Sequence, residues 1–137
     1  DDDLMPNPSL VKKMYDKQLP IVGVYGKSGV SSSNSYQELT DHWNEDSKVD
    51  FIVGAITLIK QSALDLLKKD IDKIGYPKRG DDIIISYLLK KYLNLKYLDT
   101  VGGKVLNLPE DDVGLNTDTE HYNMRWQVVE QFKKISY

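Results

Sequence analysis

The sequence predicts an α/β fold in a single domain, and three observations lead to this. Segments rich in β-branched residues alternate along the chain with segments whose apolar residues recur at helical spacing. The length of 137 residues suits one domain, so residues 1–137 are treated as one unit. Hydrophobic residues make up 40% of the chain and charged residues 28%, a balance that can fill a core.

The first half of the chain predicts a helix, a strand and a long loop, in that order. Ser9 is a candidate N-cap for a short helix through Asp16. Residues 21–25 form an apolar run typical of a strand. Residues 26–50 are polar and lack an apolar period, which predicts a mobile loop over the acceptor side of a site. Residues 49–59 are apolar and β-branched, which predicts one or two buried strands.

The second half predicts three helices and two short strands. Ser62, with Asp65 three residues later, predicts the capped start of a helix that runs to Ile74. Residues 81–93 have an acidic start and a basic end, which suits a helix dipole. Strands are expected at 97–101 and 105–108. A last helix is expected from Thr119 to about Ile135, with an apolar stripe of Tyr122, Trp126, Val129 and Phe132.

The composition excludes several classes of function. Eighteen basic and 21 acidic residues give a net charge of −3, which argues against a nucleic-acid surface. No apolar run approaches the roughly 20 residues of a membrane span. The chain has no cysteine, which excludes disulfides and thiolate metal sites and is compatible with a cytoplasmic location.

Two acidic clusters are candidates for chemistry. Asp1, Asp2 and Asp3 are adjacent carboxylates, which favour a hard cation such as Mg²⁺ or Mn²⁺. The alternative is a disordered acidic end, and on its own that alternative is the better supported. Asp81 and Asp82 open the predicted helix at 81–93, where a carboxylate stays ionised and can accept a proton from a hydroxyl. The alternative for this pair is an ordinary helix cap.

Two further groups of residues can bind a substrate. His121 and Arg125 are four residues apart and share one helix face, so they can ligate a metal or clamp a phosphate. The alternative is a solvated helix face, and on spacing alone that alternative is the better supported. Tyr36, His42 and Trp43 can stack on sugar rings, and a cluster that merely holds the loop down is an equal alternative.

The order of these pieces resembles the GT-A glycosyltransferases. Asp1-Asp2-Asp3 resembles the Asp-X-Asp motif of that family, and residues 54–60 resemble its strand with a Gly-Ala step and a basic end. Asp81-Asp82, followed by the apolar residues 83–89, resembles the acidic pair that opens a helix in the family. Gly114-Leu115, His121 and Arg125 are similar to a late pattern in glycosyltransferases of large DNA viruses, such as those that glycosylate chlorella-virus capsids.

The resemblance implies a mixed sheet flanked by helices, whose N-terminal nucleotide-binding half would precede Asp1. It implies a nucleoside-diphosphate sugar donor, UDP-linked, a glycan or glycoprotein acceptor, and Mn²⁺ or Mg²⁺ as cofactor. For a viral protein it implies the host cytoplasm. The roles carried over are metal ligands at Asp3 and Asp1, an inverting base at Asp82 or Asp81, and substrate contacts at Asp1, Asp2, His121, Arg125, Gly54 and Ala55.

Two other functions fit the same residues. A sugar-nucleotide-forming nucleotidyltransferase also uses carboxylates and a divalent ion. A carbohydrate-binding domain without catalysis needs no base at Asp81 or Asp82, and this pair therefore distinguishes it from a transferase.

Overall fold

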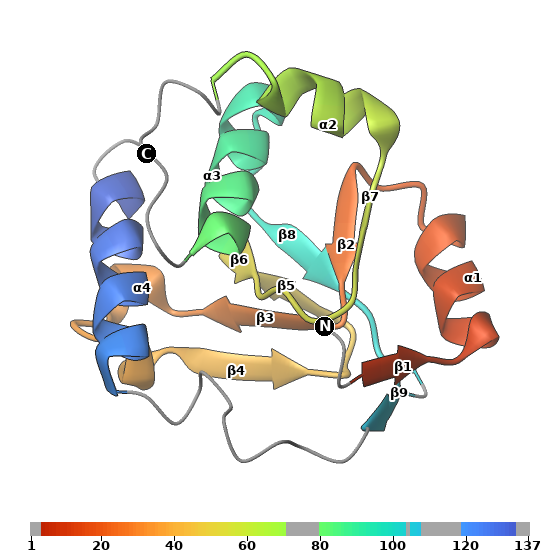
Figure 1. Cartoon of the computed structure of the whole chain (residues 1–137), viewed down its shortest axis with the longest axis horizontal. Coiled ribbons are helices and arrows are strands. Elements are labelled where there is room, and N and C mark those ends of the chain that lie inside the picture. Colours follow the sequence, from red (N-terminus) through yellow and green to blue (C-terminus); the bar gives the residue numbers. More distant parts are fainter. Residues whose placement is uncertain (1–3, 71–79, 104, 108–118, 134–137) are drawn as a thin grey trace.

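The computed structural model describes residues 4–70, 80–103, 105–107 and 119–133, which form a mixed α/β domain (Figure 1). Four short strands make a mixed sheet in the order β5 (Ser47–Val49), β8 (Leu98–Thr100), β2 (Ile21–Gly23) and β7 (Thr57–Ile59). Strand β2 is parallel to β8 and antiparallel to β7, and β5 is antiparallel to β8. The α/β prediction is therefore confirmed.

A second, antiparallel sheet of three strands carries much of the segment predicted to be a loop. Strand β3 (Tyr25–Ser28) lies between β4 (Thr40–Trp43) and β6 (Phe51–Ile52). Two 3₁₀ turns, η1 (Val30–Ser32) and η2 (Tyr36–Glu38), connect β3 to β4. The loop prediction for 26–50 is wrong because β4 is largely exposed and polar, so its sequence lacks the apolar alternation by which a strand is recognised. A further pair joins β1 (Leu4–Pro6) to β9 (Val105–Asn107).

The first two helices begin at residues other than those expected. Helix α1 (Pro8–Asp16) is capped by Asn7, whose side chain accepts a hydrogen bond from the Ser9 backbone N–H at 2.9 Å. Pro8 occupies the first turn, where it needs no hydrogen-bond partner, so the cap precedes Ser9. Helix α2 (Gln61–Leu67) follows Lys60 at its N-cap, and Ser62 lies inside the first turn. The expected continuation from 71 to Ile74 lies outside the described residues.

The last two helices agree with the prediction and define the core. Helix α3 (Asp81–Leu93) begins after Gly80, whose φ of 114° is left-handed, and a Cβ there would meet Val128 at 3.1 Å. Helix α4 (Thr119–Lys133) packs against α3, and Val129 and Phe132 of its stripe are buried. In Figure 1, α4 lies at the left and α1 at the right, with the strands between them. Within the described residues, no helix has the length and apolar character needed to cross a bilayer.

Candidate active site

An ion pair between α3 and α4 forms the centre of the candidate site. Arg125 Nη2 donates to Asp82 Oδ2 at 2.8 Å, and the two side chains are only 7% and 14% exposed. Asp82 lies in the first turn of α3, and Arg125 lies near the middle of α4. Because Gly80 permits α4 to approach the start of α3 closely, the carboxylate and the guanidinium meet where these helices pack.

Two backbone N–H groups complete the orientation of the Asp82 carboxylate. The Gly54 N–H donates to Oδ2 at 2.8 Å, and the Ile83 N–H donates to Oδ1 at 2.9 Å. Three donors from three segments therefore fix one carboxylate. A Cβ at Gly54 would lie 3.6 Å from the nearest Asp82 atoms, which is ordinary contact, so the N–H of Gly54 and not its lack of a side chain matters here.

Tyr36 holds Arg125 from the other side. Arg125 Nε donates to the Tyr36 hydroxyl at 2.8 Å, and the Tyr36 ring stacks on Tyr122 at 5.5 Å between centroids. Burial raises the pKa of Tyr36 to about 12, with Arg125 acting in the opposite direction. Burial alone would lower the pKa of Arg125, but Asp82 and Tyr36 outweigh it and raise that pKa. Arg125 is thus a permanent buried cation.

A second polar cluster lies on the β3–β4 hairpin next to Tyr36. Lys27 forms an ion pair with Asp41, and its Nζ lies 4.6 Å from the centroid of the Tyr36 ring. The Tyr25 hydroxyl donates to the same Asp41 oxygen at 2.7 Å. Partial burial would raise the pKa of Asp41, but the hydrogen bonds from Lys27 and Tyr25 outweigh it and lower that pKa. Burial, together with Asp41, raises the pKa of Tyr25.

The structure brings together three of the residues predicted from sequence, namely Asp82, Arg125 and Gly54. Asp81 is exposed at the start of α3. Ala55 packs against a separate small cluster that includes Leu10. Asp1, Asp2 and Asp3 lie outside the described residues, as do Gly114 and Leu115.

His121 and Arg125 differ in their surroundings. Arg125 is 6% exposed, so the alternative of a solvated helix face is wrong for it. His121 is partly buried, with its ring edge-on to Tyr122 at 5.5 Å. The expected contact of both residues with a diphosphate stays a prediction.

Sequence reasoning missed Lys27, Asp41 and Tyr25. Their spacing could have indicated them. Tyr25 and Lys27 are two residues apart, as are Asp41 and Trp43, and in a strand this spacing places both side chains on one face. Of the three aromatic residues proposed to stack on sugars, Tyr36 is 3% exposed and belongs to the core, His42 is partly buried, and Trp43 is 41% exposed.

The opposite face of the same hairpin carries a chain of polar contacts. His42 Nε2 lies 2.7 Å from Ser28 Oγ, and His42 Nδ1 lies 2.9 Å from Glu45 Oε1. Gly26 and His42 are paired in the register, which puts this chain on the face away from Tyr25 and Trp43. The contacts join β3 to β4 and stiffen the hairpin.

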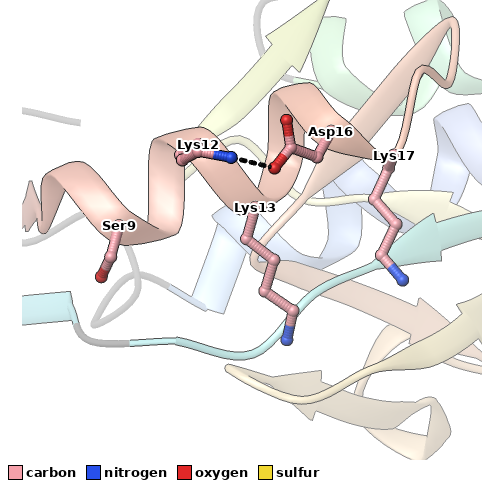
Figure 2. Close-up of a pocket in the computed structure, with 5 residues that line it drawn as sticks. All are labelled: Ser9, Lys12, Lys13, Asp16 and Lys17. Carbon is pink, nitrogen blue, oxygen red and sulfur yellow. Dashed lines mark hydrogen bonds and ion pairs between the residues drawn. The ribbon is translucent and has the colours of Figure 1, made fainter.

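A shallow hollow on α1 is separate from the ion pair. It is lined by Ser9, Lys12, Lys13, Asp16 and Lys17. Figure 2 shows Lys12 directed at Asp16 along the same helix, with Lys13 and Lys17 extending away from that pair. Lys13 binds Asp46 and the Gly102 carbonyl oxygen, so its charge already has partners within the fold.

The residues expected to bind metal are those at the start of the chain. In the described ranges, no three His, Asp or Glu side chains are grouped so that they could hold a metal ion. Oxygen donors such as the carboxylates of Asp1 and Asp3 are the ligand type that Mg²⁺ and Mn²⁺ prefer, so the donor chemistry fits the expected ion.

No protein-family model matches the chain, and no curated protein matches it.

Proposed function

We propose that the chain is the metal- and acceptor-binding part of an inverting glycosyltransferase with a GT-A fold. It would move a sugar from a nucleoside-diphosphate sugar, UDP-linked, to an acceptor hydroxyl. The observation that carries the proposal is the Asp82 carboxylate, which three donors hold at the start of α3. The mixed sheet with flanking helices is compatible with this fold.

Asp82 serves as the base in this proposal. Oδ2 accepts from both Gly54 and Arg125, whereas Oδ1 accepts from the Ile83 N–H, so Oδ1 is the atom with capacity for an acceptor hydroxyl. The hydroxyl oxygen attacks the anomeric carbon while its proton passes to Oδ1. The bond from that carbon to the diphosphate oxygen breaks, and the nucleoside diphosphate leaves with the electron pair.

Arg125 is a positioning residue for this base. Its guanidinium is fixed by Tyr36 and Asp82, and a base held on a rigid element keeps the orientation that proton transfer requires. Asp3 and Asp1 are the residues that would hold Mn²⁺ or Mg²⁺, which when bound neutralises the charge on the diphosphate.

The test is a product-release assay on the full-length protein with UDP-sugars, Mn²⁺ and a chelator control. The proposal expects metal-dependent release of UDP. Release of pyrophosphate from a nucleoside triphosphate and a sugar 1-phosphate would instead identify a nucleotidyltransferase. Saccharide binding without turnover of any UDP-sugar would identify a non-catalytic carbohydrate-binding domain.

A further inference from the structure

One face of the β3–β4 hairpin carries an aromatic pair, in which Tyr25 is partly buried and Trp43 is exposed. The register places Tyr25 opposite Trp43 and Lys27 opposite Asp41, and residues directly opposite in an antiparallel pair share a face. The Tyr25 and Trp43 rings meet edge to face, with centroids 5.4 Å apart and planes at 82°. Trp43 is nevertheless 41% exposed, so a large apolar ring faces solvent with its orientation fixed by Tyr25.

A hydrogen-bond acceptor lies next to this pair. The Asp41 side chain is 59% exposed, and both of its described hydrogen bonds, from Lys27 and from Tyr25, use Oδ1. Oδ2 is therefore the oxygen with capacity for a ligand hydroxyl. Because Lys27 and Tyr25 fix the carboxylate, the acceptor and the aromatic ring keep a constant relative position.

Two routes connect this face to Asp82. Lys27 Nζ lies 4.6 Å from the Tyr36 ring, and the Tyr36 hydroxyl binds Arg125, which binds Asp82. Along the backbone, the Val53 N–H donates to the Tyr25 carbonyl oxygen at 2.9 Å, and the next residue, Gly54, donates to Asp82. The aromatic pair and the base thus belong to one connected part of the molecule.

We infer that Trp43, Tyr25 and Asp41 form a subsite for a pyranoside acceptor. The apolar C–H face of the sugar ring lies on the Trp43 indole, and a ring hydroxyl donates to Asp41 Oδ2. The acceptor is then a glycan and not a bare peptide side chain, because a peptide hydroxyl offers no pyranose face to the indole. The inference rests on the proposed function, since it identifies the acceptor of the same site.

Trp43 provides its own spectroscopic probe. The chain has two tryptophans, so Trp126→Phe leaves Trp43 as the sole indole fluorophore. In this background the protein is titrated with the methyl glycopyranosides of glucose, galactose, mannose and xylose. We expect a saturable shift of Trp43 emission with at least one of them. The absence of a saturable response with all four would overturn the inference.

Kinetics with the full-length protein give the second measurement. Trp43→Ala should raise the KM for the binding glycoside tenfold or more. Asp41→Asn should also raise that KM. Tyr15→Ala is the matched control, because Tyr15 is a 65% exposed aromatic on α1, and it should change nothing. An unchanged KM in Trp43→Ala, with folding confirmed by circular dichroism, would also overturn the inference.

The two measurements separate this inference from the proposed function. Suppose that UDP-sugar hydrolysis depends on metal, but no glycoside changes the Trp43 emission. This result would contradict the subsite and leave the transferase proposal intact. A Trp43 response to glycosides in a protein that turns over no UDP-sugar would support the pyranoside site and contradict the transferase proposal.

Discussion

Arg125 Nε donates to the Tyr36 hydroxyl at 2.8 Å, although 89 residues separate them in the chain. This bond ties the segment between β3 and β4 to helix α4, and it passes through a guanidinium that also binds Asp82. The orientation of the candidate base therefore depends on a tyrosine in a segment without sequence periodicity.

Removing the Tyr36 hydroxyl tests this dependence. Tyr36→Phe keeps the ring that stacks on Tyr122 but leaves Arg125 Nε without its described acceptor. A buried donor that loses its partner costs about 1–3 kcal/mol, so the free energy of unfolding should fall by that amount in urea titrations. Tyr15→Phe, at an exposed position, should stay within about 0.5 kcal/mol of the parent. Equal stability of the two variants would show that the Tyr36 bond contributes nothing.

The ion pair itself is open to a double-mutant cycle. In the parent the Asp82 side chain is 14% exposed, and Arg125→Ala removes its cation, which should lower the free energy of unfolding by about 3 kcal/mol or more. Asp82→Ala together with Arg125→Ala should cost less than the sum of the two single changes, because the second change removes the uncompensated charge. Strict additivity in urea unfolding would argue against an energetic coupling between these residues.

Two substitutions of Gly54 distinguish the loss of its backbone N–H from the steric effect of an added side chain. Gly54→Ala should be tolerated in both stability and turnover, because the added Cβ meets Asp82 only at 3.6 Å. Gly54→Pro removes the N–H that donates to Asp82 Oδ2, so turnover should fall with loss of the carboxylate orientation. The measurement is the rate of UDP release for both variants. A larger loss of UDP release in the alanine variant would show that the site requires space at residue 54 and not its N–H.

The buried side chain of Lys90 should make the stability of the protein depend on pH. This side chain is 2% exposed and donates to the Asp50 carbonyl oxygen at 2.7 Å, and burial lowers its pKa from 10.5 to about 8. Below pH 8 it is charged in both the folded and the unfolded chain, and its burial is unfavourable. Between about pH 8 and 10.5 the folded chain loses this proton before the unfolded chain does, so stability should rise by roughly 1–3 kcal/mol.

Replacing Lys90 separates its contribution to stability from that of other groups that titrate in the same pH range. Lys90→Met should lack the rise between pH 8 and 10.5 in chemical unfolding, whereas Lys91→Met, at an exposed position on the same helix, should keep it. A parent and a Lys90→Met variant with the same pH slope would show that Lys90 keeps its ordinary pKa.

Helices and strands that are marked by their own residues could be predicted from the sequence. The sequence predicts helix α3 because an acidic start and a basic end flank an apolar run, and it predicts β2 because Ile21 and Val22 are β-branched. The expected caps of α1 and α2 each lie two residues too late, because Pro8 and Gln61 already belong to the first turns. Differences of this size are usual at helix ends.

Long-range contacts could not be predicted in this way. The hairpin of β3 and β4 is stabilised by cross-strand pairs such as Lys27 with Asp41, and the spacing within one segment does not show which residue of the other segment lies opposite. The sequence draws attention to the acidic pair at the start of α3, but it does not indicate that the partner of Asp82 lies 43 residues away on α4. Sequence spacing linked Arg125 to His121 on one helix face, whereas tertiary packing links it to Asp82 and Tyr36.

The most direct test of the central claim is the turnover of Asp82→Asn beside Asp81→Asn in the full-length protein. The asparagine is nearly isosteric but cannot take the proton from an acceptor hydroxyl. The proposal predicts that Asp82→Asn lowers turnover on the order of 10²-fold or more while UDP and Mn²⁺ affinities stay near normal. Asp81→Asn, at the exposed neighbour, should retain most of the turnover. Full activity of Asp82→Asn would contradict the assignment of the base, and full activity of both variants would contradict the inverting mechanism.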